Sequence, residues 1–237
     1  MLLDILFDGT ENLMANVLAL LVVIPCLLFS LSVHEYAHGF AAYKQGDGFA
    51  KLSGRLTINP LKHIDPLGFA CMLLVGFGWA KPVPVVPANF KNGRKSMIIV
   101  SVAGVVANML LAFVFAFLWY FLCFIVFPNV SWFFESERGI LLFTVINMIF
   151  GNLISVNVTL AVFNLVPIPP LDGYKLLKEL AIGKINYNFF TTMERHSTII
   201  LLAFLFLSNR IGIIAGLSGL FLDAITSVMD LIFVAFI

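Results

Sequence analysis

Two histidines and a glutamate stand close together inside a long apolar stretch, in the sequence His34-Glu35-Tyr36-Ala37-His38. If this stretch is helical, His34 and His38 share one face of the helix, where two imidazoles can hold one metal ion. Glu35 then lies beside the ion without being a ligand, close enough to act on a metal-bound water. The spacing therefore predicts a metal site with a carboxylate beside it.

The surroundings of this motif make its ionisable groups informative. Residues from about 12 to 42 are almost wholly apolar, so the motif falls within a predicted membrane-spanning helix. Histidine and glutamate are costly at that depth, and ionisable groups found there usually serve a function. The alternative is that both histidines only bond backbone carbonyls inside a helical bundle.

A third metal ligand must come from elsewhere, because a catalytic zinc site needs three protein ligands and one open position. Asp172 stands out, since three of the five residues before it are prolines and Gly173 follows it. Broken backbone at membrane depth is tolerated where it is buried or lines a water-filled cavity. An ordinary turn at the membrane boundary would show the same pattern. The other candidates for this ligand are Asp65, Asp223, Asp230, Glu179, Glu194, His63 and His196.

The composition indicates a polytopic membrane protein. The chain is 61% hydrophobic and 11% charged, with a mean hydropathy of +1.03, whereas a soluble domain is about a quarter charged. The net charge of +1 argues against a nucleic-acid partner. No polar stretch is long enough for a separate soluble domain. We therefore expect one membrane-embedded domain over residues 1–237, with a core at about 12–180 and accessory spans at 197–237.

Hydropathy predicts an all-α bundle of transmembrane helices. Long apolar stretches at about 12–43, 97–127 and 140–166 each exceed the roughly 20 residues that a crossing needs. Two further apolar runs, at 197–208 and 211–237, close the chain, and the first of them is short for a crossing.

A different element is expected between the first two long spans. Polar and apolar residues alternate over 51–58, which is typical of a short strand. The apolar run at 66–80 is short for a crossing and contains glycines, so it fits a hairpin or re-entrant segment. Repeated prolines make 81–87 extended. We therefore predict a short β-hairpin or re-entrant element.

The distribution of charge predicts the orientation in the membrane. Residues 44–95 carry eight lysines and arginines against two acids, and residues 175–195 carry four more basic residues. Basic loops favour the cytoplasmic side. The N-terminus is then expected outside, and the histidine motif near the cytoplasmic face.

Several motifs together resemble those of the site-2 protease family, the M50-type intramembrane zinc metalloproteases. They cover about residues 31–178. The similarity is greatest to the compact bacterial branch, which lacks a PDZ domain and a cystathionine-synthase-type domain. The motifs are H-E-Y-A-H, G-R-L-T-I-N-P-L-K-H-I-D-P-L-G, G-F-G-W-A-K-P-V-P-V, S-V-A-G-V-V-A-N and N-L-V-P-I-P-P-L-D-G.

The resemblance implies a site and a cofactor. His34, His38 and Asp172 would hold one zinc ion per chain, and Glu35 would be the general base. Asn108 and Asn164 match asparagines that the family places near the active site, which implies hydrogen bonds to the substrate or to its developing oxyanion. Hydrogen bonding between helices in lipid is the alternative for both asparagines.

His63 and Asp65 lie two residues apart in a predicted turn. His63 could support the metal ligands, shuttle a proton or replace a ligand. The alternative is a capped turn, in which Asp65 orders the backbone before Pro66.

The resemblance further implies regulated intramembrane proteolysis in a bacterial cytoplasmic (inner) membrane. The substrate would be a transmembrane segment of another protein, locally unwound because a helix hides its peptide bonds. The rival function is a membrane metal-ion transporter or a non-catalytic zinc-binding protein, since histidines and aspartates in spans also line ion paths. A transporter needs no general base, so Glu35 favours the protease. The oligomeric state is open.

Overall fold

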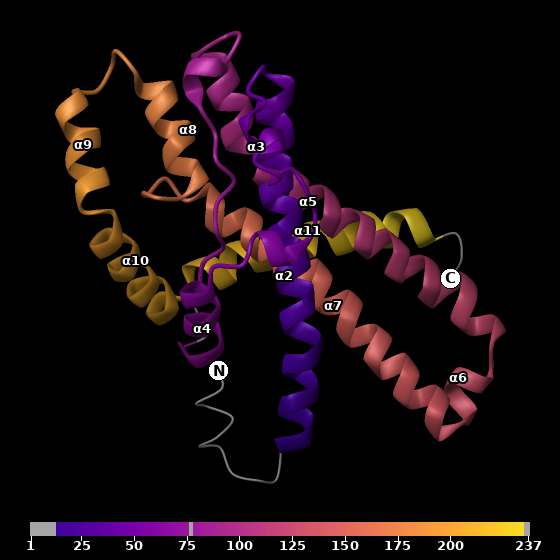
Figure 1. The fold of residues 1–237 in the computed structure, drawn as a ribbon. Helices are drawn as coiled ribbons and strands as arrows, with labels where there is room; N and C mark the ends of the chain where they lie inside the picture. The colour runs from indigo at the N-terminus through magenta and orange to yellow at the C-terminus, as the bar shows by residue number, and fades with distance from the viewer. Residues whose placement is uncertain (1–12, 76–77, 235–237) are drawn as a thin grey trace.

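A single long helix carries the histidine motif. The computed structural model describes residues 13–75 and 78–234, and its first helix, α2, runs over Leu13–Lys44 (Figure 1). This helix has 32 residues and is rich in leucine, valine and alanine, which is long enough to cross a bilayer. The chain turns away at Gly46, whose φ of 108° suits glycine. The motif therefore lies in the last third of a membrane-length helix, as predicted.

Two further long helices pack side by side. The first, α5, covers Arg94–Phe121 and continues as a π-helix over Leu122–Val126. The second, α7, covers Glu137–Leu165 and follows the short helix α6 at Trp132–Glu135. Ser136 caps α7, because its hydroxyl oxygen accepts a hydrogen bond from a backbone N–H of the first turn.

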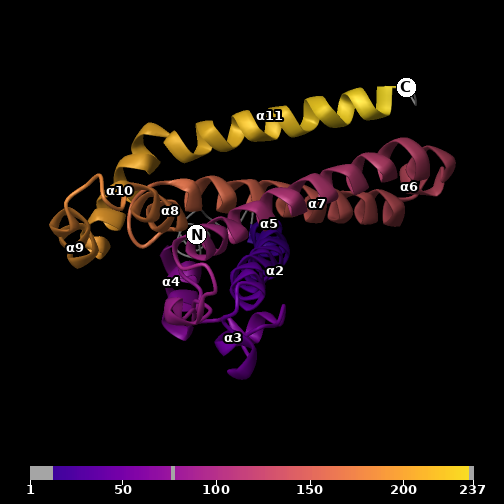
Figure 2. The ribbon, with the colours of Figure 1, turned by 90° about the horizontal axis from the view of Figure 1, so that it is seen from above.

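The long helices form three layers (Figure 2). The α5–α7 pair lies in the middle, with α2 on one side and α11 (Ile213–Phe233) on the other. Small side chains of α5 let the layers approach closely. The core between α5, α7 and α11 is built by Ala112, Ala116, Val158, Val162, Ile225, Met229 and Phe233. The helix α11 contributes to this core. The accessory role of residues 197–237 stays a prediction.

The chain is an integral membrane protein. Within the described residues, four helical segments are long and apolar enough to cross a membrane, and a fifth crossing needs α9 (Tyr187–Arg195) and α10 (Ser197–Ile211), which meet at a 72° bend. The short apolar run at 197–208 therefore belongs to a helical segment long enough to cross a membrane only if α9 is counted with α10. The four segments are Asn16–Lys44, Arg94–Asn129, Glu137–Leu165 and Ile213–Phe233.

The predicted strand at 51–58 is wrong. Phe49–Leu52 forms the one-turn helix α3, which starts where the Asp47 carboxylate accepts a hydrogen bond from the Phe49 N–H at 3.1 Å. Gly54 then takes a positive φ. No strand occurs among the described residues. The alternation over 51–58 lacks a neighbouring strand to pair with, so local turn chemistry decides its conformation.

The segment between α3 and α5 leaves the bundle and returns to the same place. Its helix α4 (Pro66–Val75) has 10 residues, too few for a crossing. The residues on either side of α4 meet in an isolated antiparallel bridge between Ile64 and Ala80, and the Lys81 N–H donates to the His63 carbonyl at 2.7 Å. The segment thus has the path of a hairpin but is built around a helix. Its entry into the membrane stays a prediction.

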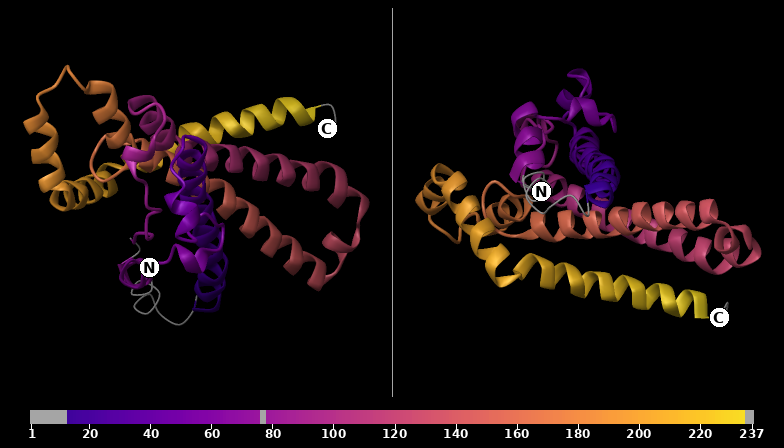
Figure 3. Two further views of the ribbon diagram at one scale, coloured as in Figure 1. Left: turned by 45° about the horizontal axis from the view of Figure 1, so that its top comes forward. Right: turned by 90° about the horizontal axis from the view of Figure 1, so that it is seen from below.

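The chain between α7 and α11 gathers at one end of the molecule. There, α8 (Asp172–Ala181), α9 and α10 lie together, at the end of the α5–α7 pair that is far from α6 (Figure 3). Pro167, Pro169 and Pro170 separate α7 from α8. The break brings α8 back onto α5 and its first residue, Asp172, to the histidines of α2.

Candidate metal centre

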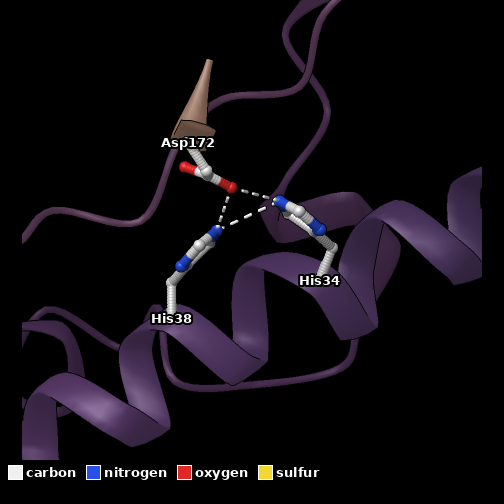
Figure 4. Close-up of side chains that lie close together, drawn as sticks. All are labelled: His34, His38 and Asp172. Atoms are coloured by element: carbon white, nitrogen blue, oxygen red, sulfur yellow. Dashed lines mark hydrogen bonds and ion pairs between the residues drawn. The ribbon is translucent and has the colours of Figure 1, made fainter. Parts of the chain in front are cut away.

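Three side chains from two distant parts of the chain meet at one point (Figure 4). The Nε2 atoms of His34 and His38 lie 3.0 Å apart, and they lie 3.1 and 2.9 Å from Oδ2 of Asp172. All three residues are buried, with at most 8% of their surface exposed. Among the described residues these three form the group that could hold a metal ion, and Asp172 is the one carboxylate that joins the histidines.

The Nδ1 atoms of the two histidines determine what their Nε2 atoms can bind. His38 Nδ1 donates to the Val100 carbonyl at 2.7 Å, and His34 Nδ1 donates to the Asn108 side-chain oxygen at 2.6 Å. Since both oxygens can only accept, each neutral ring presents a lone pair at Nε2. Two lone pairs and a carboxylate oxygen therefore face one another, which is repulsive unless a cation lies among them.

The donor set fits zinc. Imidazole nitrogens and a carboxylate oxygen are its usual ligands, at about 2.0–2.2 Å, and a tetrahedral arrangement separates such ligands by about 3.3 Å. The separations of 2.9–3.1 Å here need an expansion of only a few tenths of an ångström. Three protein ligands leave a fourth position open.

A glycine of α5 makes room for the rings. A Cβ atom at Gly104 would lie 2.5 Å from both His34 Cε1 and His38 Nε2, far inside van der Waals contact. Sequence reasoning assigned no role to Gly104, although a glycine inside a helix costs about 1 kcal/mol relative to alanine and so calls for a packing reason. Its role is to let α5 pass directly over the metal centre.

We therefore expect Gly104→Ala to weaken zinc binding by more than about 10-fold, because the added methyl group must push the imidazoles apart. Competition with a chelator of known affinity measures this effect in detergent-solubilised protein. Gly151→Ala is the matched control, since a Cβ atom at Gly151 of α7 would have no neighbour within 4 Å. Equal zinc affinity in the two variants would contradict the packing role of Gly104.

Comparison with known proteins identifies the family. Residues 133–208 match the family model described as Peptidase family M50. The chain is also 42% identical over 154 residues to the "Putative zinc metalloprotease YwhC" of Bacillus subtilis (strain 168), a match that covers 65% of this chain and 66% of that relative. The chain belongs to peptidase family M50. This confirms the family resemblance of the motifs.

A second M50 relative is more distant. The "Putative zinc metalloprotease Rip2" of Mycolicibacterium smegmatis (strain ATCC 700084 / mc(2)155) is 30% identical over 163 residues, which covers 67% of this chain and 56% of the relative. The matches thus span about two thirds or less of the relatives' own length. No solved structure matches this chain. The absence of a PDZ domain stays a prediction.

The candidate metal centre opens into a cavity of about 800 Å³. Its walls come from α2, α5, α7, α8, α10 and the segment that precedes α5. Glu35 lines this cavity, and its Oε2 atom accepts a hydrogen bond from the Val83 N–H at 2.8 Å. The three candidate ligands and Glu35 therefore lie in the wall of one cavity.

Asp172 is held from both sides. While Oδ2 faces the two imidazoles, Oδ1 accepts a hydrogen bond from the Lys175 ammonium group at 2.9 Å, one turn along α8. Lys175 also lines the cavity. Sequence reasoning missed this residue, whose only signal was a spacing of three residues from a candidate ligand. The contact keeps one carboxylate oxygen turned toward the metal position.

A buried carboxylate after α2 fixes the segment that crosses the cavity. Asp47, which is fully buried, accepts hydrogen bonds from the Val86 N–H at 2.7 Å and from the Asn89 side chain at 2.8 Å. Burial by itself would raise the pKa of Asp47, but these bonds and the one from Phe49 outweigh it and lower the pKa. Asp47 thus stays ionised and holds the residues around Val83 against Glu35.

The two family asparagines lie in different places. Asn164 lines the cavity, and its amide donates to the Leu160 carbonyl at 2.9 Å. Asn108 is fully buried and bonds to His34, behind the metal centre. Contacts of either residue with a substrate stay predictions.

His63 and Asp65 lie outside the metal group. The Asp65 carboxylate accepts from the Gly68 N–H at 2.8 Å, and His63 Nε2 donates to the Thr57 carbonyl at 2.7 Å. This geometry is that of the capped turn. Both residues line a second cavity of about 280 Å³ beside the first. A supporting role for them at the metal stays a prediction.

Proposed function

We propose that this M50 member is an intramembrane zinc metalloprotease, a metalloendopeptidase that cleaves transmembrane segments of other membrane proteins. The observation that supports it best is the convergence of two imidazole nitrogens and a carboxylate oxygen within a membrane helix bundle, beside a glutamate that lines a cavity. The names of the relatives, which describe zinc metalloproteases, support the same reaction.

In the proposed mechanism, zinc held by His34, His38 and Asp172 would supply a Lewis acid that polarises the peptide carbonyl and lowers the pKa of a water molecule. Glu35 takes the proton of the attacking water and then delivers it to the leaving nitrogen. Before the reaction, the Val83 N–H keeps the Glu35 carboxylate at the cavity wall. Lys175 keeps Asp172 in place through its second oxygen.

The substrate has to be unwound, and the segment over Val83 and Val85 offers an edge for it. Along an extended chain, the backbone N–H and C=O groups of successive residues point to opposite edges. The backbone groups of Val83 and Val85 therefore point to the same edge. The Val83 N–H faces Glu35, which places this edge at the active site. Pro82 and Pro84 have no N–H for the opposite edge. We propose that an unwound substrate pairs with this edge. The glycine- and proline-rich region proposed as this edge covers residues 76–86, of which 76–77 lie outside the described residues.

Val85→Pro should lower cleavage by at least about 10-fold while zinc binding stays unchanged, because the substitution removes one backbone donor from the edge. Val85→Ala is the matched control, since it shortens the side chain and keeps the N–H. Rates of cleavage in proteoliposomes, together with zinc per chain, make the comparison. Full activity of Val85→Pro would rule out pairing at this edge.

The proposed function is tested by removing and restoring the metal. Treatment with a chelator should abolish cleavage of a transmembrane substrate in proteoliposomes, and one equivalent of zinc should restore it. The rival is a metal-ion transporter, for which the buried histidines and Asp172 would line the ion path. Vesicles that contain a zinc-sensitive dye distinguish the two. Zinc influx without cleavage would replace the protease by the transporter.

We further propose that the whole chain is one membrane-embedded domain in a bacterial cytoplasmic membrane, with its metal centre near the cytoplasmic face. The basic residues of 44–95 and 175–195 support this orientation. Residues 44–95 follow the end of α2 that carries the histidines, and residues 175–195 follow Asp172, which contacts these histidines. The lipid bilayer and a transmembrane protein are then its partners.

A further inference from the structure

We propose that Asn157 of α7 is a positioning residue that acts through Asn108 and sets His34 in the ring form able to bind metal. The inference rests on the proposed zinc centre. It concerns a polar cluster of Ser30, Asn108 and Asn157, all fully buried between α2, α5 and α7. Sequence reasoning considered neither Ser30 nor Asn157.

The direction of the hydrogen bonds in this cluster begins at two backbone carbonyls. The Ser30 hydroxyl donates to the Cys26 carbonyl at 2.8 Å, so its oxygen is left to accept. The Asn157 amide donates one hydrogen to the Ser30 hydroxyl oxygen at 2.9 Å and the other to the Leu153 carbonyl at 2.7 Å. Because carbonyl oxygens cannot donate, the Asn157 amide group cannot be turned round without losing both bonds.

The oriented Asn157 then orients Asn108. Its side-chain oxygen accepts from the Asn108 amide nitrogen at 2.7 Å, and that nitrogen also lies 3.4 Å from the Ser30 carbonyl. The Asn108 oxygen is therefore the atom that faces His34 Nδ1, at 2.6 Å. If Asn108 were turned, its NH₂ group would face Nδ1, the ring proton would move to Nε2, and Nε2 would no longer offer a lone pair to the metal.

The two histidines differ in this respect. His38 Nδ1 donates to the Val100 backbone carbonyl, whose direction no side chain controls. His34 depends on two asparagines in succession. Hydrogen bonds between membrane helices also hold bundles together. A purely structural role of Asn157 would change stability but would not act on zinc through Asn108.

The experiment measures zinc affinity of the full chain in detergent, by competition with a chromogenic chelator, and the absorption spectrum after cobalt substitution. Asn157→Leu should bind zinc about 10-fold more weakly or worse and alter the cobalt spectrum. Asn152→Leu is the matched control on the same helix, because the Asn152 amide donates to the Met148 carbonyl of its own helix at 2.8 Å. The control should stay within about twofold of the wild type.

A double variant tests the route. If Asn157 acts through Asn108, then Asn108→Leu combined with Asn157→Leu should bind zinc within about twofold of Asn108→Leu alone. Asn157→Asp keeps the acceptor for Asn108 and should recover most of the affinity. The inference would be overturned if the losses of zinc affinity in the two single variants multiplied in the double variant. An unchanged zinc affinity in Asn157→Leu would also overturn it.

Two safeguards keep the outcome clear. If Asn157→Leu does not fold, the smaller substitution Asn157→Ala removes the same acceptor for the Asn108 amide and should weaken zinc binding severalfold, and unchanged binding there would also overturn the inference. Wild-type protein that binds no zinc would instead overturn the proposed function. Zinc affinity is read without any substrate, so a failure to find the substrate leaves this test intact.

Discussion

Replacing Asp172 by alanine should weaken zinc binding by more than about 100-fold, so that the purified protein carries almost no metal. Partners that only orient a ligand already cost 10–100-fold when removed, and Asp172 supplies a ligand atom itself. Its Oδ2 atom lies within 3.1 Å of both imidazole nitrogens, and only 4% of the residue is exposed. Zinc per chain, measured by elemental analysis after gel filtration, gives the result. Cleavage should disappear together with the metal.

The control for this variant is another carboxylate on a helix. Asp223→Ala removes an exposed carboxylate of α11 that sequence reasoning also considered as the third ligand. It should keep the wild-type zinc content. If Asp172→Ala kept its zinc, the third ligand would lie elsewhere, and His63 would be the next residue to replace.

Replacing Glu35 by glutamine should reduce cleavage by about 10²–10⁴-fold and leave zinc content unchanged. That range is typical for the loss of a general acid or base. Glutamine has nearly the same shape, and its side-chain oxygen can still accept the hydrogen bond from the Val83 N–H, so the cavity wall should be preserved. Rates measured with a transmembrane substrate in proteoliposomes, at equal zinc content, isolate the proton transfer from metal binding.

The control for Glu35 is a glutamate near the site but outside the cavity. Glu179→Gln changes a half-buried glutamate on α8, the helix that begins with Asp172, and should leave both cleavage and zinc content as in the wild type. Wild-type cleavage by Glu35→Gln would assign the base to another group. Loss of zinc in Glu35→Gln would mean that Glu35 is itself needed to build the metal centre.

Local sequence patterns were sufficient to predict part of the candidate site. His34, Glu35 and His38 are neighbours on one helix, and a helix fixes how residues four apart lie relative to each other. Apolar runs likewise predict spans, because the bilayer sets a required length. Asp172 was a harder case, since it lies 138 residues from His34 along the chain. Its context of prolines and glycine, together with the family resemblance, was what favoured it.

The alternation over 51–58 shows where local patterns fail. A strand needs a neighbouring strand to pair with. Here the chain instead forms the short helix α3 after Asp47 and then a turn at Gly54. One isolated bridge between Ile64 and Ala80 closes the chain around α4, but the predicted β-hairpin does not form among the described residues. The pattern predicted the course of the chain but not its hydrogen bonding.

By itself the sequence determined the membrane class, the helix that carries two candidate metal ligands and the candidate base, and the family. Only the tertiary structure decided which atoms surround these groups. Gly104 touches the rings because α5 crosses α2 there, and Asn157 reaches Asn108 because α7 packs against α5. The Val83 N–H meets Glu35 across 48 positions of the chain. Such contacts depend on helix packing, which no periodicity within one segment encodes.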